Sequence, residues 1–286
     1  MTETVWTPYK ASTKINKMLD TIYPHSIERF PVDLEFLAKN IHTLFNWNDP
    51  ISQVESANVD RFEGVLFKNN NNSWTLLYNN TIPSKERIRF TQAHEIGHYV
   101  LHRTQQEEFM CSEQIIREFD DDQINIEDQA NLFASNLLVP IRDFRKITEQ
   151  QVFSFDFLSF CTNRYGVSLE AILIKWLELT DENMVAIISI DGFMKWSYSS
   201  KRAYRAKAVF PTRKKIIQIP EKSLCANHLT PNCLEGSLVQ TNIWFEGAAP
   251  HGYLTEYKLL TESLDRIITI LKLPRDEELW YCSNQN

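Results

Sequence analysis

The sequence contains no run of 18 or more apolar residues, and residues 1–17 include no long apolar stretch. We therefore expect neither a membrane-spanning helix nor a secretory signal peptide. Basic residues are also few: 30 Lys and Arg stand against 37 Asp and Glu, giving a net charge of -7. This balance argues against a dedicated nucleic-acid binder and against electrostatic attachment to an anionic membrane.

Cysteines are few, odd in number and irregularly spaced: Cys111, Cys161, Cys225, Cys233 and Cys282. Such a set is typical of free thiols in a reducing compartment, so we expect a soluble cytoplasmic protein. The segment that contains Cys225, His228 and Cys233 resembles part of a metal knuckle. A partner pair at the right spacing is absent, and we interpret these residues as free thiols and a surface histidine.

The chain has 286 residues, enough for one large domain or two. Apolar residues recur at the helical period in its first 180 residues. The helices expected from this spacing cover 11–23, 31–45, 84–102, 126–138 and 168–179, and two β-like runs at 62–68 and 73–79 form a hairpin or a longer turn. Pro31 is expected in the first turn of its helix.

After residue 183 the pattern changes to β. The runs 184–190 and 193–199 flank Asp191-Gly192, a strong hairpin signal. Strand-like runs follow at 215–219, 237–245 and 253–260, and 263–273 is ambiguous between strand and helix. We predict an α+β fold: a largely helical domain with a small sheet at 1–182, then a β-rich region at 183–286 that binds substrate or senses a signal. The basic segment 201–215 is interpreted as a solvated face, with nucleic-acid contact as the alternative.

His94-Glu95-Ile96-Gly97-His98 has the H-E-x-x-H pattern. Two histidines four residues apart lie on one helix face, so both imidazoles can bind a single cation. Glu95 lies about 100° around the helix, where it reaches a metal-bound water without being a ligand. The competing interpretation is an ordinary amphipathic helix with two structural histidines.

A catalytic zinc needs a third protein ligand and an open position for water. Glu127 and Asn131 lie four residues apart at the start of the next predicted helix. On one face, Glu127 can bind the metal while Asn131 orients an imidazole. Asp128 is the rival carboxylate, and an acid favoured by the helix dipole is the structural alternative for Glu127.

These stretches resemble the ImmA/IrrE family of metallopeptidases. The resemblance rests on FTQAHEIGHYVLH (90–102) and EDQANLFASNLLVP (127–140), supported by PVDLEFLAKNI (31–41), the short β runs GVLF and LLYN, and YGVSLEAILIKWLEL (165–179). Val139 stands where Met is usual and Lys175 replaces an Arg, and neither is a ligand position.

The resemblance implies a zincin-like metallopeptidase domain with one Zn²⁺ per chain. Its ligands would be His94, His98 and Glu127, and Glu95 would be the catalytic base. It also implies a zinc endopeptidase that cleaves a separate helix-turn-helix repressor in stress, phage or mobile-element regulation. No helix-turn-helix is visible in this chain, so we expect a protein partner and neither a membrane nor nucleic acid.

Other roles stay open at this stage. Tyr99, Tyr78, His102 and Arg89 are candidates to stabilise the oxyanion, and the sequence does not choose among them. A fourth protein ligand would close a catalytic site, so we interpret His102 as a residue behind the ligands. The alternative function is a non-catalytic interaction module that retains the zinc fold and binds a partner protein.

Overall fold

The computed structural model describes residues 6–24, 26–58, 61–111, 121–227, 229–230, 232–248, 251–261 and 266–274. The chain divides into two compact units. Unit 1 comprises Met1–Val152 and Phe157–Ile172, and unit 2 comprises Phe153–Asp156 and Leu173–Asn286. The division near residue 172 lies inside a helix, and the predicted domain boundary at 182/183 stays a prediction. Among the described residues, no helix has both the length and the apolar character to cross a membrane.

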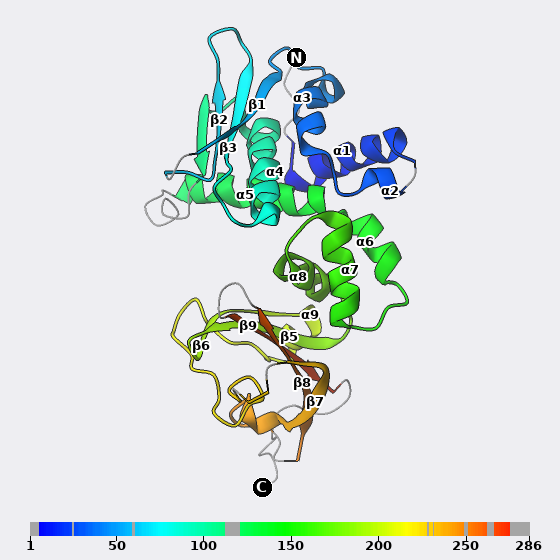
Figure 1. Cartoon of the computed structure of the whole chain (residues 1–286), viewed down its shortest axis with the longest axis vertical. Helices are drawn as coiled ribbons and strands as arrows, with labels where there is room; N and C mark the ends of the chain where they lie inside the picture. The colour runs from blue at the N-terminus through cyan, green and yellow to red at the C-terminus, as the bar shows by residue number, and fades with distance from the viewer. Residues whose placement is uncertain are drawn as a thin grey trace. The chain divides into compact units, whose positions relative to one another are not determined.

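Unit 1 contains a mixed sheet in the order β1-β3-β2-β4 (Figure 1). Its strands are β1 (Ile51–Ala57), β2 (Gly64–Lys68), β3 (Trp74–Asn79) and β4 (Glu108–Cys111). β2 and β3 form the predicted antiparallel hairpin, β1 runs parallel to β3, and β4 pairs antiparallel with the other edge of β2. The sequence did not predict β1, because this strand is mostly polar, or β4, because it has only four residues.

Helix α4 (Lys85–His102) carries the H-E-x-x-H pattern and matches its prediction closely. It begins where Ser84 accepts a hydrogen bond from the Arg87 amide at 3.1 Å, a typical N-cap. α4 packs against β2 and β3 on one side and against α5 (Asp121–Leu138) on another. Because it has neighbours on several sides, its last ten residues are almost all buried, the polar ones included.

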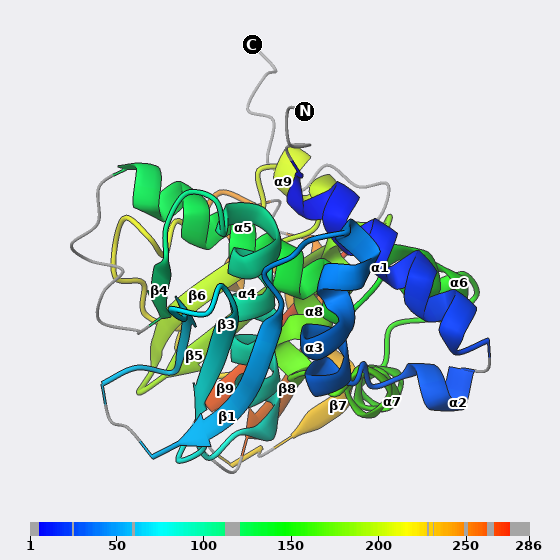
Figure 2. The same ribbon diagram turned by 90° about the horizontal axis from the view of Figure 1, so that it is seen from above.

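Two further helices of unit 1 support this layer. α1 (Pro8–Ile22) packs on α5, and α3 (Leu34–Phe45) lies beside β1 (Figure 2). Asp33 caps α3 by accepting the Phe36 amide at 2.9 Å. The expectation that Pro31 lies in the first turn is wrong, because this cap places the helix start after it.

The remaining helices are short. They are α2 (Ser26–Arg29), α6 (Ile141–Thr148), α7 (Phe155–Tyr165), α8 (Leu169–Leu179) and α9 (Lys201–Arg205). Ser168 caps α8 as predicted, by accepting the Ala171 amide at 3.2 Å. α6 and α7 were not predicted.

Unit 2 contains an antiparallel sheet in the order β6-β5-β9-β8-β7. Its strands are β5 (Asn183–Ile190), β6 (Phe193–Ser199), β7 (Cys233–Gln240), β8 (Tyr253–Thr261) and β9 (Arg266–Leu273). The hairpin prediction is confirmed: Asp191 and Gly192 both have positive φ, 52° and 80°, which suits a tight turn between twisted strands. Of the ambiguous segment 263–273, the part from Arg266 to Leu273 is strand β9, and residues 263–265 lie outside the described residues.

Two strand predictions in this unit need correction. The run 237–245 is strand only to Gln240, after which Thr241–Ile243 forms a 3-10 helix that directs Trp244 and Phe245 into the core. The run 215–219 contributes only an isolated bridge between Gln218 and Phe193. Mixed α and β structure is thus present in the chain, as expected.

Candidate metal centre

Two small residues let α4 and α5 approach closely. A Cβ on Gly97 would meet Cδ1 of Phe133 at 3.0 Å and the Ala130 Cα at 3.2 Å. No larger side chain fits between these helices without moving them. The close approach brings the start of α5, with Glu127, to the histidines of α4.

Three predicted ligand residues meet in a triangle of donor atoms. His94 Nε2 lies 2.9 Å from His98 Nε2, and the Glu127 carboxylate oxygens lie 3.0 Å from His94 Nε2 and 3.2 Å from His98 Nε2. Ligands about 2.0 Å from a tetrahedral zinc are about 3.3 Å apart. The triangle therefore fits one zinc ion with little adjustment. Asp128, the rival carboxylate, is exposed.

The outer nitrogens of both imidazoles have partners. Asn131 Oδ1 lies 2.9 Å from His94 Nδ1, and His102 Nδ1 lies 3.2 Å from His98 Nδ1. Assigned from this network, Nδ1 carries the proton in both ligands and leaves Nε2 free for a metal. The ring of Phe109 also stacks on His98, with centroids 4.6 Å apart. These contacts fix both ring orientations.

Burial and charge favour the protonation states of His98 and Glu127 that metal binding needs. Burial lowers the pKa of His98, against the opposing effect of Glu127. Burial and the neighbouring His98 lower the pKa of His102 to about 4. Burial alone would raise the pKa of Glu127, but hydrogen bonds to His94 and His98 outweigh it and lower the pKa to about 2.

Glu95 is completely buried, and neither of its carboxyl oxygens has a hydrogen-bond partner among the described residues. Burial, reinforced by the charge of Glu127, raises its pKa well above the ordinary value. An unsatisfied buried carboxyl group lowers the free energy of unfolding by on the order of 1–3 kcal/mol or more, so a group of this kind in a folded protein indicates a role other than stability. A water held between Glu95 and a metal ion would supply the missing partner.

The sheet leaves room for Glu95 at a single glycine. A Cβ on Gly64 would lie 2.7 Å from Glu95 Oε1 and 2.5 Å from Cγ2 of Thr91. Gly64 pairs with Tyr78 on β3 and with Cys111 on β4. Directly paired residues point to the same face of a sheet, so Tyr78 and Cys111 flank Gly64 on the face that meets α4.

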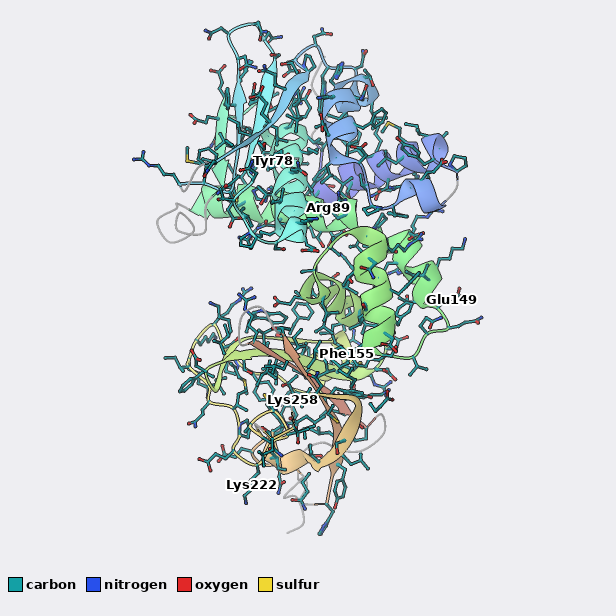
Figure 3. The ribbon with its side chains drawn as sticks, viewed as in Figure 1. Tyr78, Arg89, Glu149, Phe155, Lys222 and Lys258 are labelled. Atoms are coloured by element: carbon teal, nitrogen blue, oxygen red, sulfur yellow. The ribbon has the colours of Figure 1, made fainter. Side chains whose placement is uncertain are left out.

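Two oxyanion candidates are engaged elsewhere. The hydroxyl of Tyr99 donates to the Asp49 carbonyl at 2.9 Å from within the core. The guanidinium of Arg89 donates to the carbonyls of Val32 and Gly166, at 2.9 and 3.1 Å. Figure 3 labels Arg89 on α4 and Tyr78 on the sheet. Of the two candidates that remain, His102 contacts His98 Nδ1, behind that imidazole. Tyr78 is the one whose register puts it on the face of the sheet that carries Glu95.

Cys111 is the residue near this site that sequence reasoning missed. Single ligand atoms of His94, Cys111 and Glu127 all lie within 4.8 Å of one another. The sequence grouped Cys111 with the free thiols, since nothing local marks a cysteine at the end of a four-residue strand. Only the pairing of β4 with β2 brings it to the site.

Comparison with known proteins identifies this region. Residues 52–177 match the family model of the IrrE N-terminal-like domain, Peptidase_M78. They belong to the ImmA/IrrE family. The resemblance predicted from the sequence is therefore confirmed, and the family is one of peptidases. No curated protein matches the chain.

Solved structures add a likeness in fold. A chain described as a Mycobacterium tuberculosis transcriptional regulator matches with a TM-score of 0.52 at 12% identity. The match covers 92% of this chain and 76% of that chain. At this identity the likeness shows a shared fold alone.

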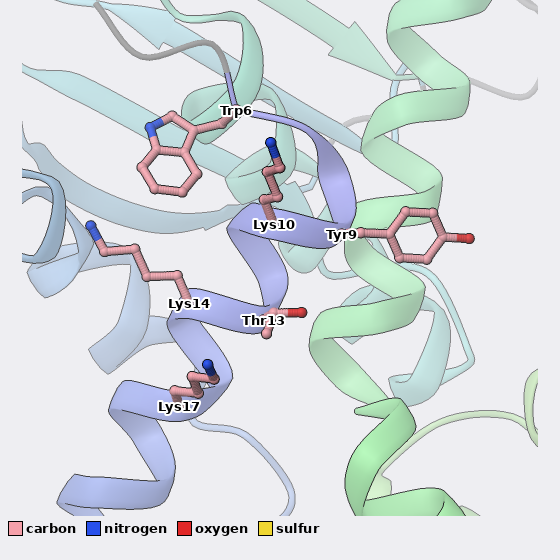
Figure 4. A pocket seen from close by; sticks show the side chains of 6 residues that line it. All are labelled: Trp6, Tyr9, Lys10, Thr13, Lys14 and Lys17. Carbon is pink, nitrogen blue, oxygen red and sulfur yellow. The ribbon is translucent and has the colours of Figure 1, made fainter.

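Two other features that lie within the described residues do not form comparable sites. A hollow beside α1 is lined mainly by aromatic and basic side chains, and no carboxylate, histidine or cysteine is among them (Figure 4): Trp6, Tyr9, Lys10, Thr13, Lys14 and Lys17. In the suspected knuckle, Cys225 is buried in the core of unit 2, whereas Cys233 begins β7 and is half-buried. His228 and Cys282 lie outside the described residues.

Proposed function

We propose that this protein is a zinc-dependent endopeptidase. The observation that carries the proposal is the buried carboxyl of Glu95, which has no hydrogen-bond partner among the described residues. It lies on α4 between His94 and His98, the two histidines that form the triangle with Glu127 of α5. A purely structural zinc site needs no such carboxyl group. A zincin-like peptidase needs one in this position, next to the first histidine of the pair.

The roles of the side chains follow from their positions. His94, His98 and Glu127 would hold the zinc, with Asn131 and His102 orienting the imidazoles. A zinc bound there supplies a Lewis acid that polarises a carbonyl and acidifies a water. Glu95 accepts the proton of the attacking water and delivers it to the leaving amine. Tyr78 would donate a hydrogen bond to the oxyanion, a role supported by its pairing with Gly64.

The edge of the sheet suits an extended peptide. β4 is the outer strand beside β2, and its last residue, Cys111, lies near His94 and Glu127. A peptide that adds a strand to this edge would run past the metal triangle, with backbone hydrogen bonds supplying affinity. This geometry supports a protein substrate.

The substrate we propose is a separate helix-turn-helix repressor, whose cleavage releases stress, phage or mobile-element genes. The family resemblance and a structural neighbour described as a transcriptional regulator support a regulatory setting. The acidic balance of the chain favours a protein over nucleic acid or a membrane as its partner. Unit 2 is then the candidate for substrate binding or sensing.

A non-catalytic interaction module is the competing function. Such a module would bind its partner without chemistry and would not need the unsatisfied carboxyl of Glu95. The presence of this carboxyl group inside a buried site favours the enzyme.

The decisive experiment is co-expression of the protein with the repressor encoded beside it, followed by mass spectrometry of fragments. We expect Glu95→Gln to retain zinc and to reduce cleavage by about 10²–10⁴-fold, the range of a general base. Glu86→Gln, an exposed glutamate of the same helix, is the matched control and should cleave normally. If cleavage persists in Glu95→Gln, another protease is responsible for it, and the non-catalytic interpretation remains.

Zinc content tests the ligand set separately. We expect about one zinc per chain in the native protein and its loss in Glu127→Ala, because that variant removes one of three ligands. Asp128→Ala, the exposed neighbour, should keep the metal. Equal zinc in both variants would contradict Glu127 as a ligand.

A further inference from the structure

We propose that Cys111 is a fourth protein ligand of the metal, whose thiolate occupies the coordination position that the attacking water needs. The protein would then exist in a closed form with four protein donors and an open form with three. The inference rests on the proposed function, since it takes His94, His98 and Glu127 as the other three ligands.

Distances place Cys111 within reach of that position. Its sulfur lies within 4.8 Å of the ligand atoms of His94 and Glu127. With zinc bonds of about 2.3 Å to sulfur and 2.0 Å to nitrogen, tetrahedral donors are about 3.5 Å apart. Relative to His94 and Glu127, the sulfur is therefore within about 1 Å of coordination distance, and a rotation of the Cys111 side chain can supply a movement of this size.

The sheet holds Cys111 at this side of the metal triangle. The Glu63 amide donates to the Cys111 carbonyl at 2.9 Å, and Cys111 pairs directly with Gly64. Gly64 in turn lies against Glu95, the group that must act on the water. The cysteine thus approaches the site on the side where Glu95 lies, and not from behind the imidazoles, where Asn131 and His102 lie.

The chemistry of the donor set supports a thiolate at the fourth position. Zinc binds cysteine sulfur strongly, and four protein ligands are typical of closed sites, whereas three and a water are typical of catalytic ones. Two neutral imidazoles and one carboxylate leave a bound zinc with one positive charge, and a thiolate neutralises it. Closure would therefore remove both the water and much of the Lewis acidity, and the peptidase would be latent until the sulfur leaves.

Cobalt substitution tests this directly. The zinc of the full-length protein is exchanged for Co²⁺, and the near-ultraviolet absorption is recorded, because a thiolate bound to Co²⁺ gives an intense charge-transfer band. We expect the band in the native protein and its loss in Cys111→Ser and in Cys111→Ala. We also expect zinc affinity to fall by about tenfold or more in both variants, as measured by competition with a chelating dye.

Cys233→Ser is the matched control, because Cys233 is also a half-buried cysteine on a strand but lies in unit 2. It should keep the band. Circular dichroism checks that both Cys111 variants are folded, and two different replacements separate loss of the ligand from a packing defect.

The outcomes separate this inference from the proposed function. If Co²⁺ binds in a manner that requires Glu127 but gives no thiolate band, Cys111 is not a ligand and the three-ligand site stands. A band that persists without Cys111 also overturns the inference, since another thiol would be responsible. If the native protein binds no Co²⁺ or Zn²⁺, both proposals fail.

Discussion

In the part of the chain that the structure describes, each unit contains one completely buried glutamate, and the two have opposite surroundings. In unit 1, neither oxygen of Glu95 has a hydrogen-bond partner among the described residues. In unit 2, Glu256 is equally buried, but Oε1 accepts the Cys225 amide at 2.6 Å and Oε2 accepts the indole N–H of Trp244 at 2.8 Å. Burial raises the pKa of both groups, whereas the bonds to Glu256 oppose that shift.

The contrast separates a structural carboxyl from a functional one. Glu256 joins β8 to the loop around Cys225 and to the 3-10 segment, so its polar atoms stabilise a fold. Glu95 stabilises nothing that the structure shows, and its environment is costly for folding. Strain of this kind is concentrated at sites of chemistry, which is how we interpret Glu95. Changes at Glu95 should therefore alter activity, whereas changes at Glu256 should alter stability.

The largest expected effect is acid sensitivity of unit 1 after a chelator has removed metal. The pKa of His102 is about 4 in the folded protein against an ordinary 6.5, so the unfolded state binds more protons between these values. The destabilisation caused by His102 is therefore absent above about pH 6.5 and grows as the pH drops toward 4. A difference of about 2.5 pH units corresponds to about 3 kcal/mol.

Urea unfolding at pH 7 and at pH 4.5 measures this loss. His102→Leu should remove the part of the loss that His102 causes, because leucine does not titrate, whereas the lowered pKa of His98 contributes in both proteins. If the dependence of stability on pH is the same in His102→Leu as in the native protein, His102 is not the group responsible.

The next effect concerns the space reserved for Glu95. Gly64→Ala places a methyl group 2.7 Å from Glu95 Oε1, so the carboxyl must move. A displacement of about 1 Å can cost about 100-fold in rate, or about 2.7 kcal/mol. Steady-state cleavage should fall by that order while zinc content stays near one per chain. Normal cleavage by this variant would mean that Glu95 works from a different position.

The smallest effect tests the structural carboxyl. Glu256→Gln places an amide N–H₂ opposite one of the two N–H donors, leaving that donor unpaired at a cost of about 2 kcal/mol. Glu95→Gln should cost little, because no hydrogen bond is lost. Thermal unfolding of both variants, with the exposed Glu149→Gln as control, measures the difference (Figure 3). Equal destabilisation would break the comparison.

The sequence predicted what depends on neighbouring residues along the chain. Ser84 and the spacing of His94 and His98 are local signals, and they place two imidazoles on one helix face. Glu127 was found because its helix carries its own pattern with Asn131. These predictions concern single helices, in which the spacing of residues along the sequence determines which side chains share a face.

Sheet register and long-range contacts were beyond that reasoning. Tyr78 was one of four oxyanion candidates and Cys111 was missed. Both lie on the face that carries Glu95 because β3 and β4 pair with Gly64, and this pairing is not encoded by spacing within one strand. Arg89 and Tyr99 lie on the same helix as the ligands, so the sequence offered them as candidates. Their partners Gly166 and Asp49 are 77 and 50 residues away, and these direct the polar groups elsewhere.

The allocation of the chain to the two units has a consequence for how such a protein can be rearranged. The backbone passes from one unit to the other between Val152 and Phe153, between Asp156 and Phe157, and between Ile172 and Leu173. The last crossing lies inside α8 and not in a loop. No single recombination breakpoint separates the units cleanly, so a peptidase half and a β-rich half cannot be shuffled between genes as interchangeable cassettes without carrying a segment of one into the other.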